Sequence, residues 1–272
     1  MARTDTLTNF LTDVAAAIKA KKNSSAAIPA ASFDTEIAAL SVGDNSTLIK
    51  LLDRSASSIT VPDGTQQIGN YAFAGCYSLS SLVLPNSIYK IGSRIITGCS
   101  RLKSLTIPEG VTSIDDYAFS GSSLTEISMP DTVQGFGEYA FENCSGLTSL
   151  TIPSAVGGVG KGMLSGCSSL KSVTFPQGVL FIKPYLFANC SSLESVTFLG
   201  NIYMIESNTA FRGCSSLSQI SFPSSSRVPI LEKSNAFSEC ASGLQIKVPS
   251  ALLDEWKAAE NWSAYADKIV AI

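Results

Sequence analysis

The sequence lacks histidine altogether and is poor in charge. None of the 272 residues is histidine, and 15% are charged, against about 25% in an average globular protein. Without an imidazole, neither a Ser-His-Asp triad nor a Cys-His pair can form, and no histidine can act as a general acid or base. We therefore do not expect an enzyme.

Other absences disfavour several kinds of partner. The 19 basic and 22 acidic residues give a net charge of −3 without a stripe of Lys and Arg, so the chain is not expected to bind nucleic acid. Apolar runs are short and interrupted, whereas a spanning helix needs roughly 20 successive apolar residues, so no membrane insertion is expected. The first residues lack the unbroken apolar stretch of a signal peptide, and ordinary secretion is not expected either.

What the sequence does have is a period of about 23 residues. Proline recurs at this spacing before a turn, at positions 62, 85, 108, 130, 153, 176, 223 and 249. Repeats of about 20 to 50 residues cannot bury their apolar faces alone and stack on one another as a solenoid. The step from Pro108 to Pro130 is one residue shorter, and we predict that the missing residue is the cysteine of that repeat.

All seven cysteines occupy one position of the repeat. They lie at positions 76, 99, 144, 167, 190, 214 and 240, so no two are closer than 23 residues. On stacked turns these side chains would run parallel, about one strand spacing apart, which is a poor geometry for disulfides. Zinc sites pair cysteines or use histidine. We therefore predict a buried ladder of free thiols, and neither a metal nor a cofactor.

Each proline follows a short run in which apolar and small polar residues alternate, as in Ser104 to Ile107. This period of two predicts a strand with one buried face, which the proline ends. The outward side chains would form a wide face that is poor in charge, and we take it as a candidate partner-binding surface. Its threonines include Thr106, Thr151, Thr174 and Thr197.

A second segment follows each proline, with Ile or Val in one position and Phe in another, as at Ile114 and Phe119. Both positions are expected to be buried. A row of tyrosines two residues before the phenylalanine would run along one edge of the stack. This row can bind sugars or partner loops by stacking, or it can belong to the packing of the turn; the sequence leaves both open. These tyrosines are Tyr71, Tyr117, Tyr139 and Tyr185.

The unit from Ile68 to Pro85, Ile-Gly-x-Tyr-Ala-Phe-x-x-Cys-x-x-Leu-x-x-Leu-x-Leu-Pro, resembles the BspA-like leucine-rich repeat. The resemblance covers residues 59–249. It implies a β-rich, right-handed leucine-rich-repeat solenoid, used for adhesion and protein binding and without catalytic residues. The chain departs from the pattern at Ile96 and Leu164, which replace phenylalanine, and at Leu199, which replaces proline.

Residues 1–43 are predicted to be a helical segment for attachment and oligomerisation. One apolar stripe of a helix would carry Leu7, Leu11, Val14 and Ile18, and we expect a homotrimer through this stripe. The segment is similar to the N-terminal segments of tail-associated and prophage structural proteins of bacterial viruses, which implies contacts with other virion tail proteins. The other interpretation is that it only caps the repeats.

Two further segments flank the predicted solenoid. Residues 44–58 are predicted to be a linker and an N-terminal cap, and residues 250–272 a C-terminal helical cap. A helix that opens after Pro249 would place Leu252 and Trp256 on one face. Such a cap is needed because the core of a solenoid is otherwise exposed at its end.

Two local patterns suggest chemistry that the context disfavours. In the glycine-rich run that begins at Gly157, the Gly-Lys pair is followed by glycine, where a phosphate loop needs Ser or Thr. The neighbouring carboxylates of Asp115 and Asp116 are predicted to face solvent, whereas a glycosidase pair must converge in a cleft. We expect neither pattern to form a catalytic site.

These features lead to two functional hypotheses. The first is a non-enzymatic receptor-binding protein in the virion tail of a bacterial virus or prophage, which touches a protein or glycan receptor on a cell surface. The alternative is a leucine-rich-repeat adhesin, at the bacterial cell surface or outside the cell, that binds proteins of a host or a neighbouring cell.

Overall fold

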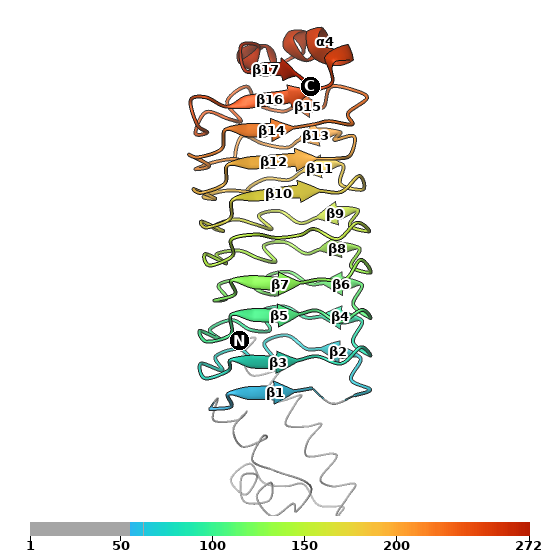
Figure 1. The fold of residues 1–272 in the computed structure, drawn as a ribbon, viewed down its shortest axis with the longest axis vertical. Coiled ribbons are helices and arrows are strands. Elements are labelled where there is room, and N and C mark those ends of the chain that lie inside the picture. Colours follow the sequence, from blue (N-terminus) through green and yellow to red (C-terminus); the bar gives the residue numbers. More distant parts are fainter. Residues whose placement is uncertain (1–54, 62) are drawn as a thin grey trace, which may run out of the picture.

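A computed structural model describes residues 55–61 and 63–272, which form one stack of parallel turns (Figure 1). The predicted segment 1–43, with the trimer contacts proposed for Leu7, Leu11, Val14 and Ile18, lies outside the described residues. So does most of the predicted linker 44–58. The described turns confirm the predicted leucine-rich-repeat solenoid with its repeat of roughly 23 residues.

Most turns contribute a first strand of three or four residues and a second strand of two residues. The first strands are β1 (Ser58–Thr60), β3 (Ser81–Val83), β5 (Ser104–Thr106), β7 (Glu126–Ser128), β10 (Ser172–Phe175), β12 (Ser195–Phe198), β14 (Gln219–Ser221) and β16 (Gln245–Val248). The second strands are β2 (Gln67–Ile68), β4 (Lys90–Ile91), β6 (Ser113–Ile114), β8 (Gly135–Phe136), β9 (Gly158–Val159), β11 (Phe181–Ile182), β13 (Met204–Ile205) and β15 (Ile230–Leu231).

The strands pair in parallel with their equivalents on the next turn. The second strands form the sheets β2-β4-β6-β8-β9 and β11-β13-β15, and the first strands form β1-β3, β5-β7 and β10-β12-β14-β16, extended by one more strand. The predicted strand at 149–152 is not formed. Leu150 and Ile152 are nevertheless buried and Thr151 is exposed, so the alternation of side chains continues without regular pairing.

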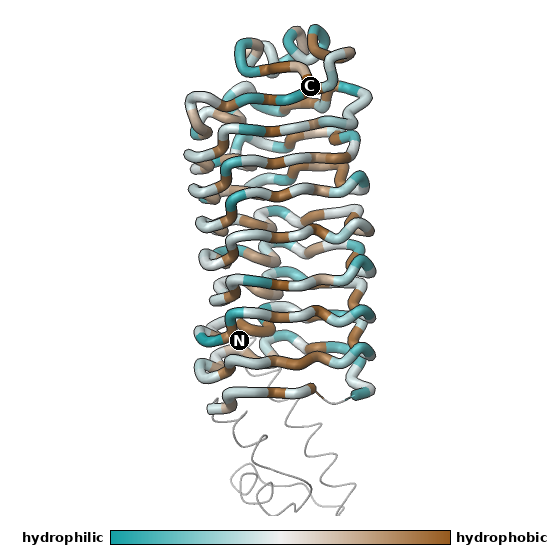
Figure 2. Tube along the Cα trace, viewed as in Figure 1, coloured by the Kyte–Doolittle hydropathy of each residue, from teal (hydrophilic) through white to brown (hydrophobic). Residues whose placement is uncertain are grey.

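The core is a set of files in which like side chains stack along the axis. In β10, Val173 and Phe175 are buried while Ser172 and Thr174 are exposed, as the period of two predicts. The rings of Phe187 and Phe211, on successive turns, stack with centroids 5.2 Å apart. The apolar segments recur at the same place on turn after turn (Figure 2). Ile96 and Leu164, which depart from the pattern, are fully buried.

The thiols form the predicted ladder. All seven cysteines are free, and all but Cys240 are buried. The repeated contact is a hydrogen bond from the thiol to the backbone carbonyl of the phenylalanine position one turn earlier. Cys99 Sγ donates to the Phe73 oxygen at 3.1 Å, and Cys190 Sγ donates to the Leu164 oxygen at 3.1 Å. These bonds satisfy the thiols inside the core, so the cysteines act as small apolar residues with one polar contact.

Ser122 corrects the interpretation of the short repeat. It is buried, its backbone nitrogen donates to the Phe119 oxygen at 3.1 Å, and its hydroxyl lies 3.4 Å from Cys144 Sγ. Serine thus stands in the cysteine position. The prediction that the cysteine itself is missing is therefore wrong: the deleted residue lies between Ser122 and Leu124, where a loop can shorten without losing a core side chain.

The C-terminal end is closed by a cap that is only partly helical. The 3₁₀ helix η2 (Ser250–Leu252) leads into α4 (Leu253–Ala258), and η3 (Ser263–Tyr265) leads into β17 (Ile269–Ala271). The helical prediction therefore fails for the last residues, because β17 pairs in parallel with β16. In the described part of the chain, no helix is long and apolar enough to cross a bilayer.

Two tryptophans seal the end of the core. The Trp256 ring lies 5.0 Å from Phe222 and 4.6 Å from Trp262, measured between centroids. Trp262 Nε1 donates to the Pro229 oxygen at 2.7 Å. Because both indoles are buried, they cover the last rings of the phenylalanine files and remove them from water.

Truncating this seal should destabilise the whole stack. For Trp256→Ala we expect the free energy of unfolding to fall by about 3–5 kcal/mol, the usual cost of removing a buried aromatic side chain. Chemical denaturation followed by circular dichroism measures the change. Glu260→Ala, which alters an exposed side chain of the same cap, should leave the midpoint unchanged. Equal midpoints for both variants would contradict the role of Trp256.

The thiol ladder should make the fold sensitive to alkali. Burial is the main cause that raises the pKa of Cys190 from 9.0 to about 12 and that of Cys99 to about 12. The unfolded chain releases these protons first, so stability is fully present below pH 9 and falls as pH rises toward the folded pKa. The expected loss above pH 9 is roughly 1.4 kcal/mol per pH unit for each such thiol.

Cys190→Ala isolates this effect from other titrations. Unfolding free energies of both proteins between pH 7 and about 11 should give a shallower alkaline slope for the variant, whatever its stability at pH 7. The native thiols should also resist alkylation at neutral pH, because the thiolate is the reactive form. Equal slopes would show that Cys190 titrates normally in the folded chain.

Candidate functional site

The predicted threonine surface lies on the first strands and, at Thr151, on the extended segment that takes the place of a first strand. Thr106, Thr151 and Thr174 are exposed, and Thr197 is half-buried. Thr174 pairs directly with Thr197 across β10 and β12, so these two side chains are neighbours on successive turns. The structure thus places all four threonines in the same outward position of successive or nearby turns. We call the outward side chains of β3 to β14 the Ser/Thr face.

The Ser/Thr face is wide and nearly uncharged. Along its two outward columns Glu126 is the single charged residue between β3 and β14. Exposure decreases toward the C-terminal end, where Ser221 of β14 is buried. A face of this kind carries hydroxyl donors and acceptors on a rigid sheet, which suits contact with another protein surface more than capture of a charged ligand.

The four tyrosines share an unusual backbone conformation. Tyr71, Tyr117, Tyr139 and Tyr185 have φ values of 59°, 56°, 55° and 59°, in the left-handed region that costs a side-chain-bearing residue about 1–2 kcal/mol. Each stands at the corner after a second strand. The corner is held by the next turn, since the backbone nitrogen of Tyr139 donates to the Lys161 oxygen at 2.8 Å.

The rings of Tyr117 and Tyr139 contact each other and further neighbours, whereas Tyr71 is exposed. Tyr117 and Tyr139 stack at 5.1 Å with an interplanar angle of 14°. The guanidinium of Arg94 lies 4.2 Å from the Tyr117 centroid on the other side, and the Tyr139 ring lies against Gly162. Rings covered in this way hold the edge of the stack together and leave little face for a sugar.

The environment of Tyr117 keeps its hydroxyl protonated. Partial burial is the first cause that raises the pKa of Tyr117, and the carboxylate of Glu142 is the next. Lys161 Nζ lies 5.2 Å from the Tyr185 ring centroid. Tyr71 is separated from Tyr117 by the turn that carries Arg94. The structure therefore favours the packing interpretation of this row, and its role in binding stays a prediction.

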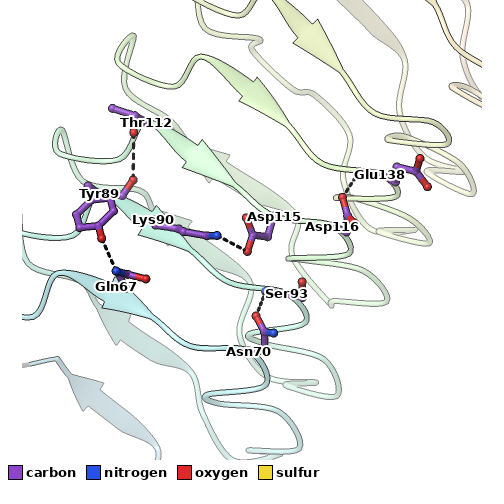
Figure 3. Close-up of polar contacts among 9 residues, drawn as sticks. All are labelled: Gln67, Asn70, Tyr89, Lys90, Ser93, Thr112, Asp115, Asp116 and Glu138. Carbon is purple, nitrogen blue, oxygen red and sulfur yellow. Dashed lines mark hydrogen bonds and ion pairs between the residues drawn. The ribbon is translucent and has the colours of Figure 1, made fainter. Parts of the chain in front are cut away.

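Polar side chains link neighbouring turns beside the tyrosines (Figure 3). Asn70 Oδ1 accepts from the backbone nitrogen of Ser93 at 2.8 Å, and Asp116 Oδ1 accepts from that of Glu138 at 2.7 Å. Asp115 Oδ2 instead lies 3.0 Å from Lys90 Nζ. The neighbouring aspartates thus serve different structural contacts and do not form a shared acid-base pair.

The described residues offer no arrangement suited to metal binding. Within residues 55–61 and 63–272, no three His, Cys, Asp or Glu side chains are grouped so as to hold an ion. In the glycine-rich run, Val159 is buried in the isoleucine file, as predicted.

One surface feature escaped the sequence analysis. The outward position of the second strands is polar or small from β2 to β9 and becomes apolar from β11 to β15. The change in this outward position can be seen when the repeats of the sequence are aligned. A strand of two residues, however, is too short to show a hydrophobic period. The side chains of this apolar patch are Leu180, Phe181, Tyr203, Met204 and Ile230.

The comparisons with known proteins agree with the repeat architecture. The sequence profile described as "BspA type Leucine rich repeat region" matches residues 52–157 and 135–254. A leucine-rich-repeat protein of T. pallidum is similar at 29% identity and a TM-score of 0.51, over 60% of this chain and 78% of that one. A leucine-rich-repeat protein of Bacteroides ovatus gives 25% identity and a TM-score of 0.50, over 79% of this chain and 66% of that one. No curated protein sequence matches.

These matches confirm the first resemblance and give no support to the second. The profile covers the repeats and stops near the cap, whereas the segment 1–43 has no counterpart among viral tail proteins in the comparisons. The fold, the file of cysteines and the matched profile all lead to the same assignment. The chain belongs to the BspA-type leucine-rich-repeat family.

Proposed function

We propose that this chain is a non-enzymatic adhesin-type protein of a bacterial cell surface or its surroundings, and that it binds a protein on another cell through the Ser/Thr face. Adhesion and protein binding are what the resemblance to the BspA-like repeats implies. The observation that carries the proposal is the outward column in which Thr106, Thr151 and Thr174 are exposed on the same side of the stack.

The physical properties of the face support this role. Strands anchored by a fully buried core present the hydroxyls in fixed positions, so little side-chain entropy is lost when a partner docks. Few charges must be desolvated, and a face that extends over several turns can supply the roughly 800 Å² per partner that a stable interface buries. The tyrosine row is a weaker candidate because its rings already stack on their neighbours.

We do not propose a role in a virion tail for this chain. That hypothesis rested on residues 1–43, which lie outside the described residues, and no comparison supports it. Antibody labelling of intact producing cells and of purified virus particles would distinguish a cell-surface location from a virion location. Labelled cells and unlabelled particles are expected, and the reverse result would restore the viral hypothesis.

A charged substitution on the Ser/Thr face should abolish adhesion without affecting the fold. For Thr151→Arg with Thr174→Arg, we expect adhesion of beads coated with the full chain to target cells to fall at least tenfold, about 1.4 kcal/mol in binding free energy. Protease treatment of the target cells should have the same effect. Flow cytometry measures both.

The control is Gln66→Arg, which adds one arginine, half of the charge that the double variant adds, at an exposed position next to β2. Its adhesion and the thermal unfolding of all variants should equal those of the parent. Adhesion that persists in the double variant, or that withstands protease but not glycosidase treatment of the target cells, would contradict the proposal.

A further inference from the structure

The apolar patch on the second strands is exposed without an evident structural need. Leu180, Phe181, Tyr203 and Ile230 are 44%, 37%, 43% and 48% exposed. Phe181 pairs with Met204, and Met204 with Ile230, across β11, β13 and β15. An aromatic side chain has a surface of about 150–250 Å². Because about 40% of each side chain is exposed, the exposed area of the patch is roughly 300–400 Å². Exposed patches of this size on monomers are often functional.

A shallow, open depression lies on the preceding turns, lined by glycines together with polar side chains such as Gln134. An open groove of about 650 Å³ crosses β6, β8 and β9, and its lining includes Gly135 and Gly158. Asp116 and Glu138, which Figure 3 labels, also line it. We call this groove the glycine furrow.

Packing does not explain the glycines at the end of the furrow. A Cβ on Gly157 or Gly158 would meet nothing within 4 Å, and neither residue has a positive φ. Gly160 is different, because a Cβ there would collide with the backbone of Gly137 and Glu138. Glycine in a strand sacrifices strand propensity and often marks a site where another chain or ligand approaches closely.

The furrow and the patch form one continuous surface. Gly158 of β9 and Phe181 of β11 hold the same outward position on successive turns, and Gly162 N donates to the Pro184 oxygen at 2.9 Å between those turns. β9 ends one sheet and β11 begins the next. The apolar patch therefore begins on the turn that follows the glycine furrow, and Figure 1 shows β11 next to β9 along the stack.

Two cationic side chains beside the apolar patch indicate which kind of ligand the patch can bind. Lys183 Nζ lies 4.8 Å from the Phe181 centroid and is paired with Glu206 at 2.7 Å. Arg227 lies 4.8 Å from the Tyr203 centroid, is exposed, and forms no ion pair within the described residues. One face of each ring is thus covered, and the rings are tilted by 59°, so they offer no flat platform for a sugar. The patch is also too small for a stable dimer, which needs roughly 800 Å² per partner.

We propose that the glycine furrow and the apolar patch bind an extended segment of a partner protein. The backbone of that segment lies over Gly158, its apolar side chains contact Phe181 and Tyr203, and a carboxylate of the segment pairs with Arg227. This second site goes beyond the adhesion proposed for the Ser/Thr face and lies on different strands, so either can fail without the other.

The test is selection of a displayed random-peptide library on the immobilised full-length chain, followed by synthesis of an enriched peptide. We expect enriched sequences to combine bulky apolar residues with Asp or Glu. Fluorescence anisotropy should show at least tenfold weaker binding to Gly158→Thr, which fills the furrow, and to Arg227→Glu, which reverses the charge. Gly158→Thr should unfold at an equal or higher temperature, because threonine favours strands.

Gly69→Thr is the matched control, since a Cβ there also meets nothing within 4 Å, and it should bind the peptide as the parent does. Three results would overturn the proposal. These are enrichment of no peptide that depends on Gly158 and Arg227, glycan-array binding that requires Phe181, and a dimer in light scattering that Arg227→Glu dissociates.

Discussion

Every side chain in this stack must fit against its own equivalent one turn away. Parallel pairing in register sets that demand, because it places Ile68 on Ile91 and Thr174 on Thr197. A residue that packs well against a copy of itself is therefore repeated, and phenylalanine does so by stacking, as between Phe187 and Phe211. Cysteine satisfies the demand differently, because its thiol reaches a carbonyl of the preceding turn and leaves no polar atom unpaired. The absence of disulfides follows from the same constraint.

The core could be predicted from the sequence because self-stacking makes each file visible as a repeated letter. The cysteine file, the alternation in Ser172–Phe175 and the buried Val159 were all anticipated on that basis and are found in the structure. Ser122 was misread because a repeat that is one residue short can be aligned in more than one way. Only the hydrogen bond to Phe119 shows which residue fills the cysteine position.

The ends and the surface were less predictable. β17 was taken for helix because Ile269 continues the apolar spacing of the preceding cap, and its pairing with β16 is a tertiary contact that no local pattern records. On the surface, selection for stacking does not act on outward side chains. The outward position that is occupied by Gly158 on one turn and by Phe181 on the next therefore shows no periodic pattern in the sequence. This change nevertheless makes that part of the surface apolar.

The pairing of β17 with β16 extends the sheet by one strand beyond the last repeat. The backbone donors and acceptors of β16 are already engaged, and the indoles of Trp256 and Trp262 cover the last aromatic rings. A neighbouring copy consequently meets no bare core at this end, and the free strand edge there is that of the short strand β17. A second stack therefore has little apolar area to bury against this cap, and the strand edge that it could extend is only the three residues Ile269–Ala271 long.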